Sequence, residues 1–513
     1  MAIAIAIAAG PLVQTLLAAT GAYALYLVAL VIYRLYFHPL AKFPGPKYAA
    51  ISHWHEAYYD VFLKGQFTFK VQEMHKKYGP IVRIVPDELH IQDSDFYETL
   101  YTKAGRVDKY EWMAGRFGDH DSAFATASDE LHRIRRGALN PLFSRQRILD
   151  LQDVIQGKID ILVERVREFQ ATGKVMPINR AFAALTEEVI LEYCFSLSYD
   201  ALREPEFEKS LHDPIMAANQ FSNVSLQFPW IPMVLFNLPQ SITVKMQPEY
   251  ALFFRMQNDF RKQIDAMKAG KMKDVLEKSS HRTVFQELVE GNLPPSEKNS
   301  LRLQGEASVV VAAGVITTGW ALSTAAFHIV NNPPIFQKLR AELEAAMPDP
   351  TVKPSWSDLE KLPYLSGCVR EGVRMSYGVT AREPRLLSKP LEYKGWIIPP
   401  RTPVSMTNVD VCDDEKIFPN PRTFQPERWI GNPKTAHGQS LERYYVSFGK
   451  GSRSCLGINL AHAELYLTIA SLFRNFDFEL YQTDISDLEL AHDFFAPSPR
   501  LDSKGVRIKV KPA

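Results

Sequence analysis

The sequence has few cysteines and almost no excess of charge of either sign. Four cysteines occur in 513 residues, far apart and without any C-x-x-C pair: Cys194, Cys368, Cys412 and Cys455. A disulfide framework or a structural zinc site is therefore not expected, and the usage is typical of a reducing compartment. Lysine and arginine number 59 against 58 acidic residues, with no long basic run, so nucleic-acid binding is not expected.

Internal repeats, low-complexity tracts and a convincing second linker are also missing. Apolar residues make up 46% of the chain, enough for a large core. Helical periodicity predicts helices over Asp150–Phe169, Tyr250–Ala269, Arg302–Asn331, Pro334–Met347 and Ile458–Phe473. Short strand patterns lie at Ile81–Ile84, Leu89–Ile91, Leu391–Ile398 and Gly505–Val510. This pattern predicts one α-rich domain with small β-sheets.

Residues 1–33 contain no charged side chain, and Leu12–Tyr33 is a mostly apolar stretch. As a helix it would span about 33 Å, enough for the hydrocarbon core of a membrane. A cleaved secretory signal is the alternative, but such a signal has a basic start and a shorter apolar core. Arg34, Lys42 and Lys47 follow the stretch, which predicts a single-pass anchor with the following chain in the cytosol.

Two prolines, Pro44 and Pro46, follow the anchor and predict a stiff, extended link. We therefore divide the chain into three parts. Residues 1–33 form the anchor, residues 34–48 the proline-containing linker, and residues 49–513 the folded domain.

The segment Phe448–Gly457, F-G-K-G-S-R-S-C-L-G, carries the most chemical information. Its three glycines let the backbone turn sharply and approach a flat ligand closely. Arg453 offers a fork of donors suited to a carboxylate. A helix starting near Leu456 would point its positive end at Cys455, and we expect this to lower the pKa of the thiol.

This segment resembles the haem-binding signature of cytochrome P-450 enzymes, F-x-x-G-x-R-x-C-x-G, at every fixed position. The resemblance implies that Cys455 is the thiolate ligand of the iron of haem b. The cofactor loop would be formed by Phe448, Gly449, Arg453 and Gly457. A thiolate on haem iron donates electron density and favours O–O cleavage. The alternative is a glycine-rich loop around a buried cysteine, and the full ten-residue pattern argues against it.

Two upstream motifs resemble the same family. Glu371 and Arg374 match its E-x-x-R, although i,i+3 pairs of this kind are common on solvated helices. Phe424–Trp429 resembles the P-E-R-F/W segment. The resemblance implies that Arg428 joins Glu371 and Arg374 in a buried charge network that braces the haem loop. These residues would be structural rather than catalytic, and the network would be costly to break.

Three further residues match positions that bind haem propionates in the family. Arg385 follows the E-x-x-R motif, and Arg136 closes a W-x-x-x-R match in which His132 replaces the tryptophan. A histidine can still donate a hydrogen bond to a propionate. For the neighbouring Arg133 and Arg135, a surface basic helix remains an alternative.

The hexapeptide Ala313–Thr318 resembles the family's A-G-x-D/E-T-T on the helix that crosses the distal haem face. The resemblance implies that Gly314 leaves room for dioxygen and that Thr317 and Thr318 supply hydroxyl groups for proton transfer. Ile316 stands where the family has an acid. We hypothesise that water, one of the threonines or a substrate hydroxyl carries protons instead. A small-residue packing face is the alternative.

The resemblance places substrate contacts in five mainly apolar segments, which suit a lipophilic small molecule and are equally consistent with ordinary core. They are Tyr110–Phe124, Phe221–Trp230, Val310–Thr317, Val379–Ala381 and Phe494–Phe495. The sequence segments Ala313–Trp320 and His132–Ser144 are similar to segments of fungal secondary-metabolism oxygenases, including those acting on terpenes. A terpenoid or polyketide substrate is therefore expected by analogy alone.

The resemblance as a whole implies a mainly α cytochrome P-450 fold with small β-sheets. It further implies a monooxygenase of the endoplasmic reticulum membrane that hydroxylates or epoxidises its substrate with O2. Electrons would come from NADPH through a separate flavoprotein, an NADPH–cytochrome reductase, docking near Cys455. Lys450 is expected to help dock it, with a merely solvated lysine as the alternative. A haem-thiolate isomerase or dehydratase that needs no external O2, and a haem-binding electron carrier, are the alternatives.

Overall fold

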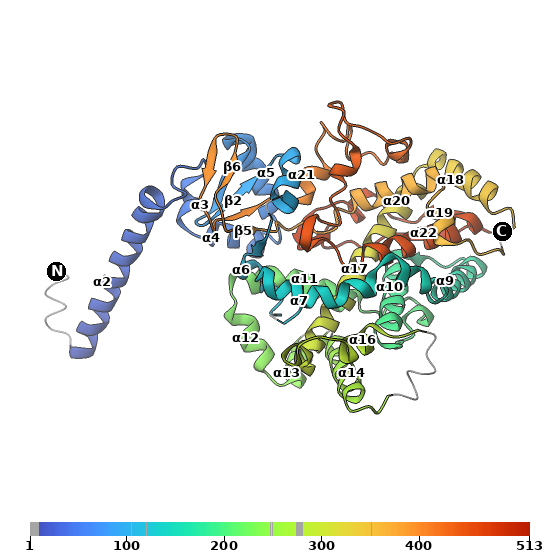
Figure 1. Ribbon diagram of the computed structural model, residues 1–513, viewed down its shortest axis with the longest axis horizontal. Helices are drawn as coiled ribbons and strands as arrows, with labels where there is room; N and C mark the ends of the chain where they lie inside the picture. The colour runs from blue at the N-terminus through green and yellow to red at the C-terminus, as the bar shows by residue number, and fades with distance from the viewer. Residues whose placement is uncertain are drawn as a thin grey trace.

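The computed structural model describes residues 10–103, 105–119, 121–246, 248, 250–272, 281–349 and 351–512. Residues 1–9 of the predicted anchor lie outside the described residues. Most of the described chain is helical, and short strands lie toward both ends of the sequence, as the sequence predicts. Figure 1 shows one helix, α2, projecting from an otherwise compact body.

The helices before the middle of the chain are α2 (Pro11–Ile32), α3 (Lys47–Ile51), α4 (Trp54–Ala57), α5 (Phe67–Tyr78), α6 (Glu111–Ala114), α7 (Asp129–Leu139), α8 (Arg145–Asp150), α9 (Gln152–Thr172), α10 (Ile178–Phe195), α11 (His212–Gln227), α12 (Trp230–Asn237) and α13 (Gln240–Met246). Those that follow are α14 (Tyr250–Lys268), α16 (Val284–Glu290), α17 (Ser300–Val330), α18 (Pro333–Ala346), α19 (Trp356–Leu359), α20 (Pro363–Met375), α21 (Asn408–Cys412) and α22 (Ile458–Asn475). The five predicted helices all occur, with ends shifted by a few residues.

The strands are β1 (Ile81–Val85), β2 (Glu88–Ile91), β3 (Val107–Lys109), β4 (Met176–Pro177), β5 (Arg385–Leu387), β6 (Leu391–Tyr393), β7 (Trp396–Ile398), β8 (Pro403–Ser405), β9 (Phe478–Leu480), β10 (His492–Phe494), β11 (Ala496–Ser498) and β12 (Arg507–Val510). The largest sheet has the order β1-β2-β8-β5-β3, and β2 and β8 form its parallel pair. In this sheet β3 pairs with β5 antiparallel, which brings residues near position 108 beside residues near position 386.

The N-terminal helix extends further than the sequence predicts. It continues from α2 through a π-helical turn, η1 (Tyr33–Phe37), and stops at His38, which is extended. The stop precedes Pro39, because a residue before proline avoids helical backbone angles. The linker then packs on the body, where Leu40 and Phe43 are buried and the Arg83 N–H donates to the Pro44 carbonyl oxygen.

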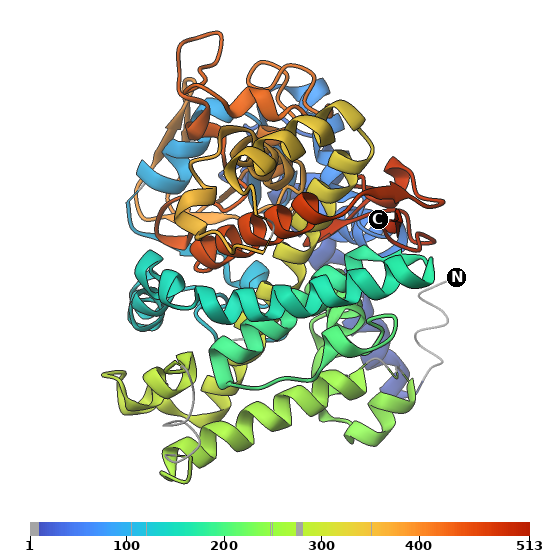
Figure 2. The same ribbon diagram turned by 90° about the vertical axis from the view of Figure 1, so that its right-hand side faces the viewer.

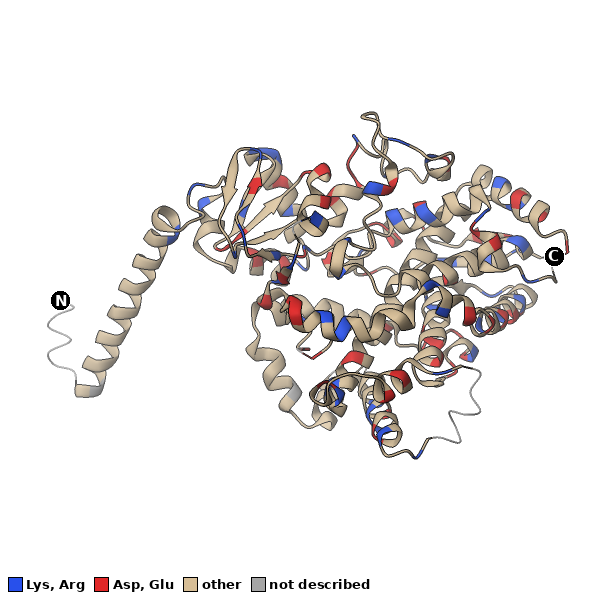
Figure 3. Cartoon of the chain, in the orientation of Figure 1, with Lys and Arg blue, Asp and Glu red and all other residues tan. Residues whose placement is uncertain are grey.

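Two described helices are long and apolar enough to cross a membrane, Val13–Phe37 and Ser300–Val330. The first is fully exposed along its apolar window and carries no charge before Arg34 (Figure 3). The second, α17, is more than half buried and packs against α10, α14, α20 and α22. Its apolar character therefore reflects its place inside the body.

Glycines set the close helix contacts around α17. A Cβ atom at Gly319 would lie 3.3 Å from the Ala183 backbone of α10, and one at Gly372 of α20 would lie 2.7 Å from the Ala325 Cβ. Both distances are at or below ordinary van der Waals contact. Figure 2 shows the body from the side, with the red helix α22 crossing its middle. The packing fixes α17 against α10, α20 and α22.

Candidate active site

The loop that carries Cys455 is shaped by glycines and closed by its own backbone. Gly451 has a φ of 73°, and a Cβ atom there would meet the Tyr101 carbonyl oxygen at 2.0 Å. No other residue type fits such an approach. The Cys455 N–H donates to the Phe448 carbonyl oxygen over 2.8 Å, and α22 begins three residues later with Gly457 as its N-cap. The turn therefore holds Cys455 at the start of α22, as predicted.

Cys455 differs from the other three cysteines, which are buried, because its side chain is exposed. Yet the protein surrounds it closely enough that desolvation raises the pKa of the thiol. A side chain with both properties faces a space inside the protein rather than the outer surface.

The predicted lowering of this pKa is wrong. The helix start at Gly457 and the charge of Arg136 both favour the thiolate, but desolvation outweighs them. A bound metal cation is the usual means by which proteins keep such a thiol deprotonated.

A cluster of buried and half-buried cations lies beside this loop. Burial and the charges of Arg453, Arg136, Lys109 and Arg385, in decreasing order, lower the pKa of His132 to about 3. His132 is therefore a neutral donor or acceptor at physiological pH. Four of the five members were predicted from the sequence. Lys109 was not, because it reaches the cluster only through β3–β5 pairing, which sets it opposite Arg385.

Donor atoms in this cluster remain available for an anion. Arg453 donates to the carbonyl oxygens of Thr126 and Ala127 over 2.6 and 2.9 Å, but its buried Nε has no partner among the described residues. The carboxylate of Glu383 lies 3.3 Å from Lys109 and 3.3 Å from Arg385. Asp129 and Asp108 also act on Arg453 electrostatically, but no ion pair joins either of them to Arg453 among the described residues. The donor set fits the two propionate groups of a haem.

The predicted charge network is present, with Glu371 and Arg374 fully buried and Arg428 half-buried. Arg374 donates to both oxygens of Glu371 at 2.9 and 2.8 Å, and Arg428 Nε donates to Glu371 Oε1 at 3.0 Å. The indole of Trp429 adds a hydrogen bond of 2.8 Å to Glu371 Oε2. Arg374 also donates to the Cys412 carbonyl oxygen over 2.8 Å. These bonds tie α20 to the segment that leads toward the Cys455 loop.

The predicted catalytic residues lie on the α17 segment, but Gly314 has a contact that the sequence does not reveal. A Cβ atom there would lie 3.1 Å from Ile190 of α10, so this glycine permits helix packing. The predicted room for dioxygen at Gly314 stays a prediction. Its neighbour Ala313 is solvent-accessible. The Thr317 hydroxyl donates to the Ala313 carbonyl oxygen over 2.7 Å.

Thr318 points in another direction. It is buried and forms a side-chain hydrogen bond with Glu464 of α22. Desolvation raises the pKa of Glu464 well above its usual value and so favours its protonated form. The chain therefore lacks an acid at position 316 but has a buried acid beside Thr318. No sequence periodicity distinguishes Glu464 from a solvated helix residue.

Two of the predicted substrate segments meet in an aromatic cluster, which we define as Phe117, Phe124 and Phe495, and a third segment is hydrogen-bonded to it. Ring centroids lie 5.1 Å apart for Phe117 and Phe495 and 5.7 Å apart for Phe124 and Phe495. The Thr380 N–H donates to the Phe495 carbonyl oxygen over 2.9 Å. Trp230, at the end of another predicted segment, is 61% exposed at the start of α12, so its contact with substrate stays a prediction.

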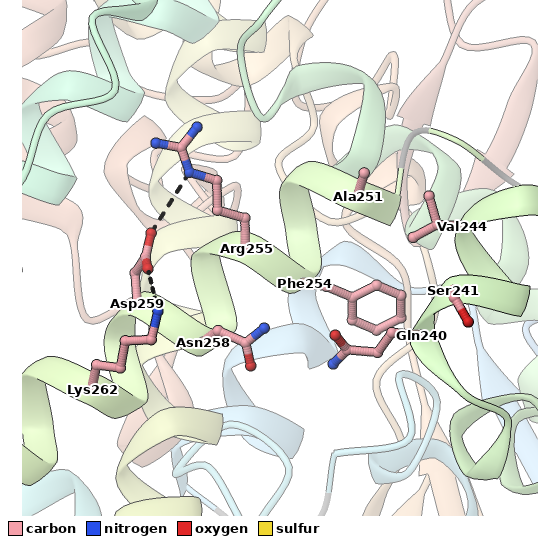
Figure 4. A pocket seen from close by; sticks show the side chains of 9 residues that line it. All are labelled: Gln240, Ser241, Val244, Ala251, Phe254, Arg255, Asn258, Asp259 and Lys262. Carbon is pink, nitrogen blue, oxygen red and sulfur yellow. Dashed lines mark ion pairs between the residues drawn. The ribbon is translucent and has the colours of Figure 1, made fainter.

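A hollow of about 420 Å³ lies elsewhere, between α13 and α14. Figure 4 shows Arg255 and Lys262 directed at Asp259, at 3.8 and 3.7 Å. Its walls include no residue of α17 or of the Cys455 loop. This hollow is therefore separate from the candidate active site.

The family comparison agrees with this geometry. The model named "Cytochrome P450" matches residues 44–504. The chain belongs to the cytochrome P450 family, and the predicted fold class is confirmed.

Curated relatives define the class of enzyme. A cytochrome P450 monooxygenase of Sordaria araneosa is 49% identical over 95% of this chain and 96% of its own. A tryptophan 6-hydroxylase of Fusarium equiseti is 42% identical over 94% of each chain. An N-acetyltryptophan 6-hydroxylase of Emericella nidulans is 41% identical over 96% and 97%. The chain is accordingly an oxidoreductase of the P450 monooxygenase class.

The buried acid Glu464 predicts a specific pH dependence of stability. Its pKa is raised in the folded state, so the folded protein holds this proton more tightly than the unfolded chain does, and stability falls as pH rises above about 4.5. Glu464→Gln removes this loss. The variant should gain stability relative to wild type with rising pH, by at most about 1.4 kcal/mol per pH unit.

Thermal denaturation between pH 5 and pH 8 measures this difference. Glu479→Gln, on the exposed side of β9, is the matched control and should show no such trend. A difference between Glu464→Gln and wild type that stays constant with pH would contradict a neutral buried acid.

Proposed function

We propose that Cys455 binds the iron of haem b as a thiolate and that the neighbouring cations and His132 hold its propionates. The observation that carries this proposal is the accessible thiol of Cys455 beside the cations Lys109, Arg136, Arg385 and Arg453 and the neutral His132. Phe448, Gly449 and Gly457 shape the loop around the thiol. When bound, haem with a thiolate ligand supplies the chemistry of O–O bond cleavage.

On the opposite side, α17 presents the residues that handle protons. We assign Thr317 and Thr318 as the pair of hydroxyl groups that transfer protons. Gly314 lets α17 approach α10 closely, and we propose that it also leaves room for dioxygen. Glu464 holds a proton next to Thr318. This pair of groups supports a relay that does not need an acid at position 316.

The substrate in this proposal is a lipophilic small molecule, which the enzyme hydroxylates or epoxidises in secondary metabolism. The aromatic cluster of Phe117, Phe124 and Phe495 supports an apolar binding surface. A terpenoid or polyketide remains the proposed class. The printed names of two relatives add tryptophan and N-acetyltryptophan as compounds to test.

We also propose that the enzyme is anchored in the endoplasmic reticulum membrane with its haem domain in the cytosol. Residues 1–33 would be the anchor, 34–48 the linker and 49–513 the haem-thiolate domain. Exposed apolar side chains support contact with lipid, since Trp230, Met233 and Val234 on α12 are all more than half exposed. Trp54 lies 5.8 Å from Phe228 and extends this apolar surface.

Electrons would come from NADPH through a separate flavoprotein reductase that docks near the Cys455 loop. Lys450 is a weak candidate for docking it, because its ammonium group donates to the Glu442 carbonyl oxygen within the same chain. The second candidate function is a haem-thiolate isomerase or dehydratase, favoured by Ile316 alone. The aromatic cluster argues against an electron carrier, because such a protein binds no substrate.

Labelled dioxygen distinguishes these functions. The full-length enzyme, reconstituted with NADPH–cytochrome reductase and offered indole acids and terpenes, should form products that contain one labelled oxygen atom and depend on NADPH. Conversion that proceeds without O2 and NADPH would instead identify an isomerase or dehydratase.

The relay predicts the effect of restoring an acid at position 316. In Ile316→Glu a second carboxyl group competes with the Thr318–Glu464 pair, so the fraction of NADPH oxidation that ends in product should fall. Ile316→Leu, which keeps the apolar character, is the control. Unchanged coupling in Ile316→Glu would mean that the residue at this position is incidental.

A further inference from the structure

Arg116 is a buried charge without an adequate partner. Its side chain is 4% exposed, and its Nη1 atom is buried with no hydrogen-bond partner among the described residues. Desolvation accordingly lowers the pKa of the guanidinium. An arginine buried in this way is costly unless an anion binds it, because its charge has lost the stabilisation that water provides.

The nearest carboxylates are already engaged by other groups. Asp493 and Asp60 both act on Arg116 electrostatically. However, Asp493 Oδ1 accepts hydrogen bonds from Thr380 Oγ1 over 2.8 Å and from the Phe495 N–H over 3.0 Å. Asp60 Oδ1 accepts from the Phe67 N–H over 3.1 Å. These carboxylates supply a diffuse counter-charge but no direct pair for the guanidinium.

Arg116 lies at the edge of the aromatic cluster. Its guanidinium carbon is 5.4 Å from the centroid of the Phe495 ring. Phe495 packs on Phe124, whose ring has the Lys109 ammonium group 3.9 Å from its centroid. Arg116 and Lys109 therefore contact different rings of the same aromatic cluster.

The backbone fixes this arrangement. Phe495 has a φ of 73°, a strained value for a residue other than glycine, and is held there by hydrogen bonds to both its N–H and its carbonyl group. The neighbouring loop is also fixed, because the Ala123 N–H donates to both oxygens of Glu306 on α17 at 3.2 and 3.1 Å. The guanidinium and the rings therefore form one preorganised surface.

We infer that the substrate of this enzyme carries a carboxylate, which Arg116 binds while Phe117, Phe124 and Phe495 contact its apolar body. The inference rests on the proposed function, because it places the substrate at the aromatic cluster. It goes further than the proposed function, because the apolar lining alone predicts a neutral ligand and Arg116 adds a charged group to it. A bidentate guanidinium–carboxylate pair would also fix the orientation of the substrate.

Matched acids and amides test this inference directly. The probes are phenylacetic, 2-naphthylacetic and 4-biphenylacetic acid, each with its primary amide. Equilibrium dialysis measures their binding to the full-length holoenzyme in detergent. Wild type should bind at least one acid roughly 10- to 100-fold more tightly than its amide, the range expected for a charged hydrogen-bonded pair.

In Arg116→Gln this preference should disappear through weaker acid binding, with amide binding unchanged, and Arg116→Lys should restore part of it. Arg133→Gln, an exposed arginine on α7, is the matched control and should keep the preference. The inference is overturned if no acid in the panel is preferred by wild type, or if Arg116→Gln weakens acids and amides equally, as a purely structural arginine would.

The outcome is independent of turnover. If the acid preference is present but no labelled oxygen enters any product, the anion site stands and the proposed function fails. If oxygen incorporation is normal and acids are not preferred, the proposed function stands and the role of Arg116 fails.

Discussion

Burial of the Glu371 carboxylate among Arg374, Arg428 and Trp429 is the interaction on which the position of the active-site loop depends. The indole of Trp429 lies 5.4 Å from Tyr445, whose ring lies 5.9 Å from Phe448 at the start of the loop. Losing one cation would leave a buried unpaired charge, at a cost of roughly 3–5 kcal/mol. The network thus links α20 to the Cys455 turn through a continuous series of contacts.

Buried positive charge is the second organising feature of the site. The cations around His132 include Lys109, which contacts the Phe124 ring of the aromatic cluster, whereas Arg116 contacts the Phe495 ring. Each set needs an anion that the protein itself does not fully supply. The interior is therefore prepared for two negatively charged partners, of which the proposed haem propionates account for one and a substrate carboxylate for the other.

Sequence reasoning succeeded where the chemistry is local. The long helix over Arg302–Asn331 and the turn at Phe448–Gly457 follow from apolar periodicity and glycine placement. It failed where tertiary pairing decides: Lys109 reaches the cation cluster through a strand partner, and Glu464 meets Thr318 across two helices. The pKa of Cys455 was predicted in the wrong direction, because helix polarity is visible in sequence and burial is not.

The central claim is that Cys455 is the thiolate ligand of a haem. The most direct test is the carbon monoxide difference spectrum of the reduced, detergent-solubilised enzyme, recorded beside Cys455→Ala. A strongly red-shifted Soret band in the wild type that is lost in the variant is the predicted result. An unshifted band in the wild type, or one that does not depend on Cys455, would contradict the claim.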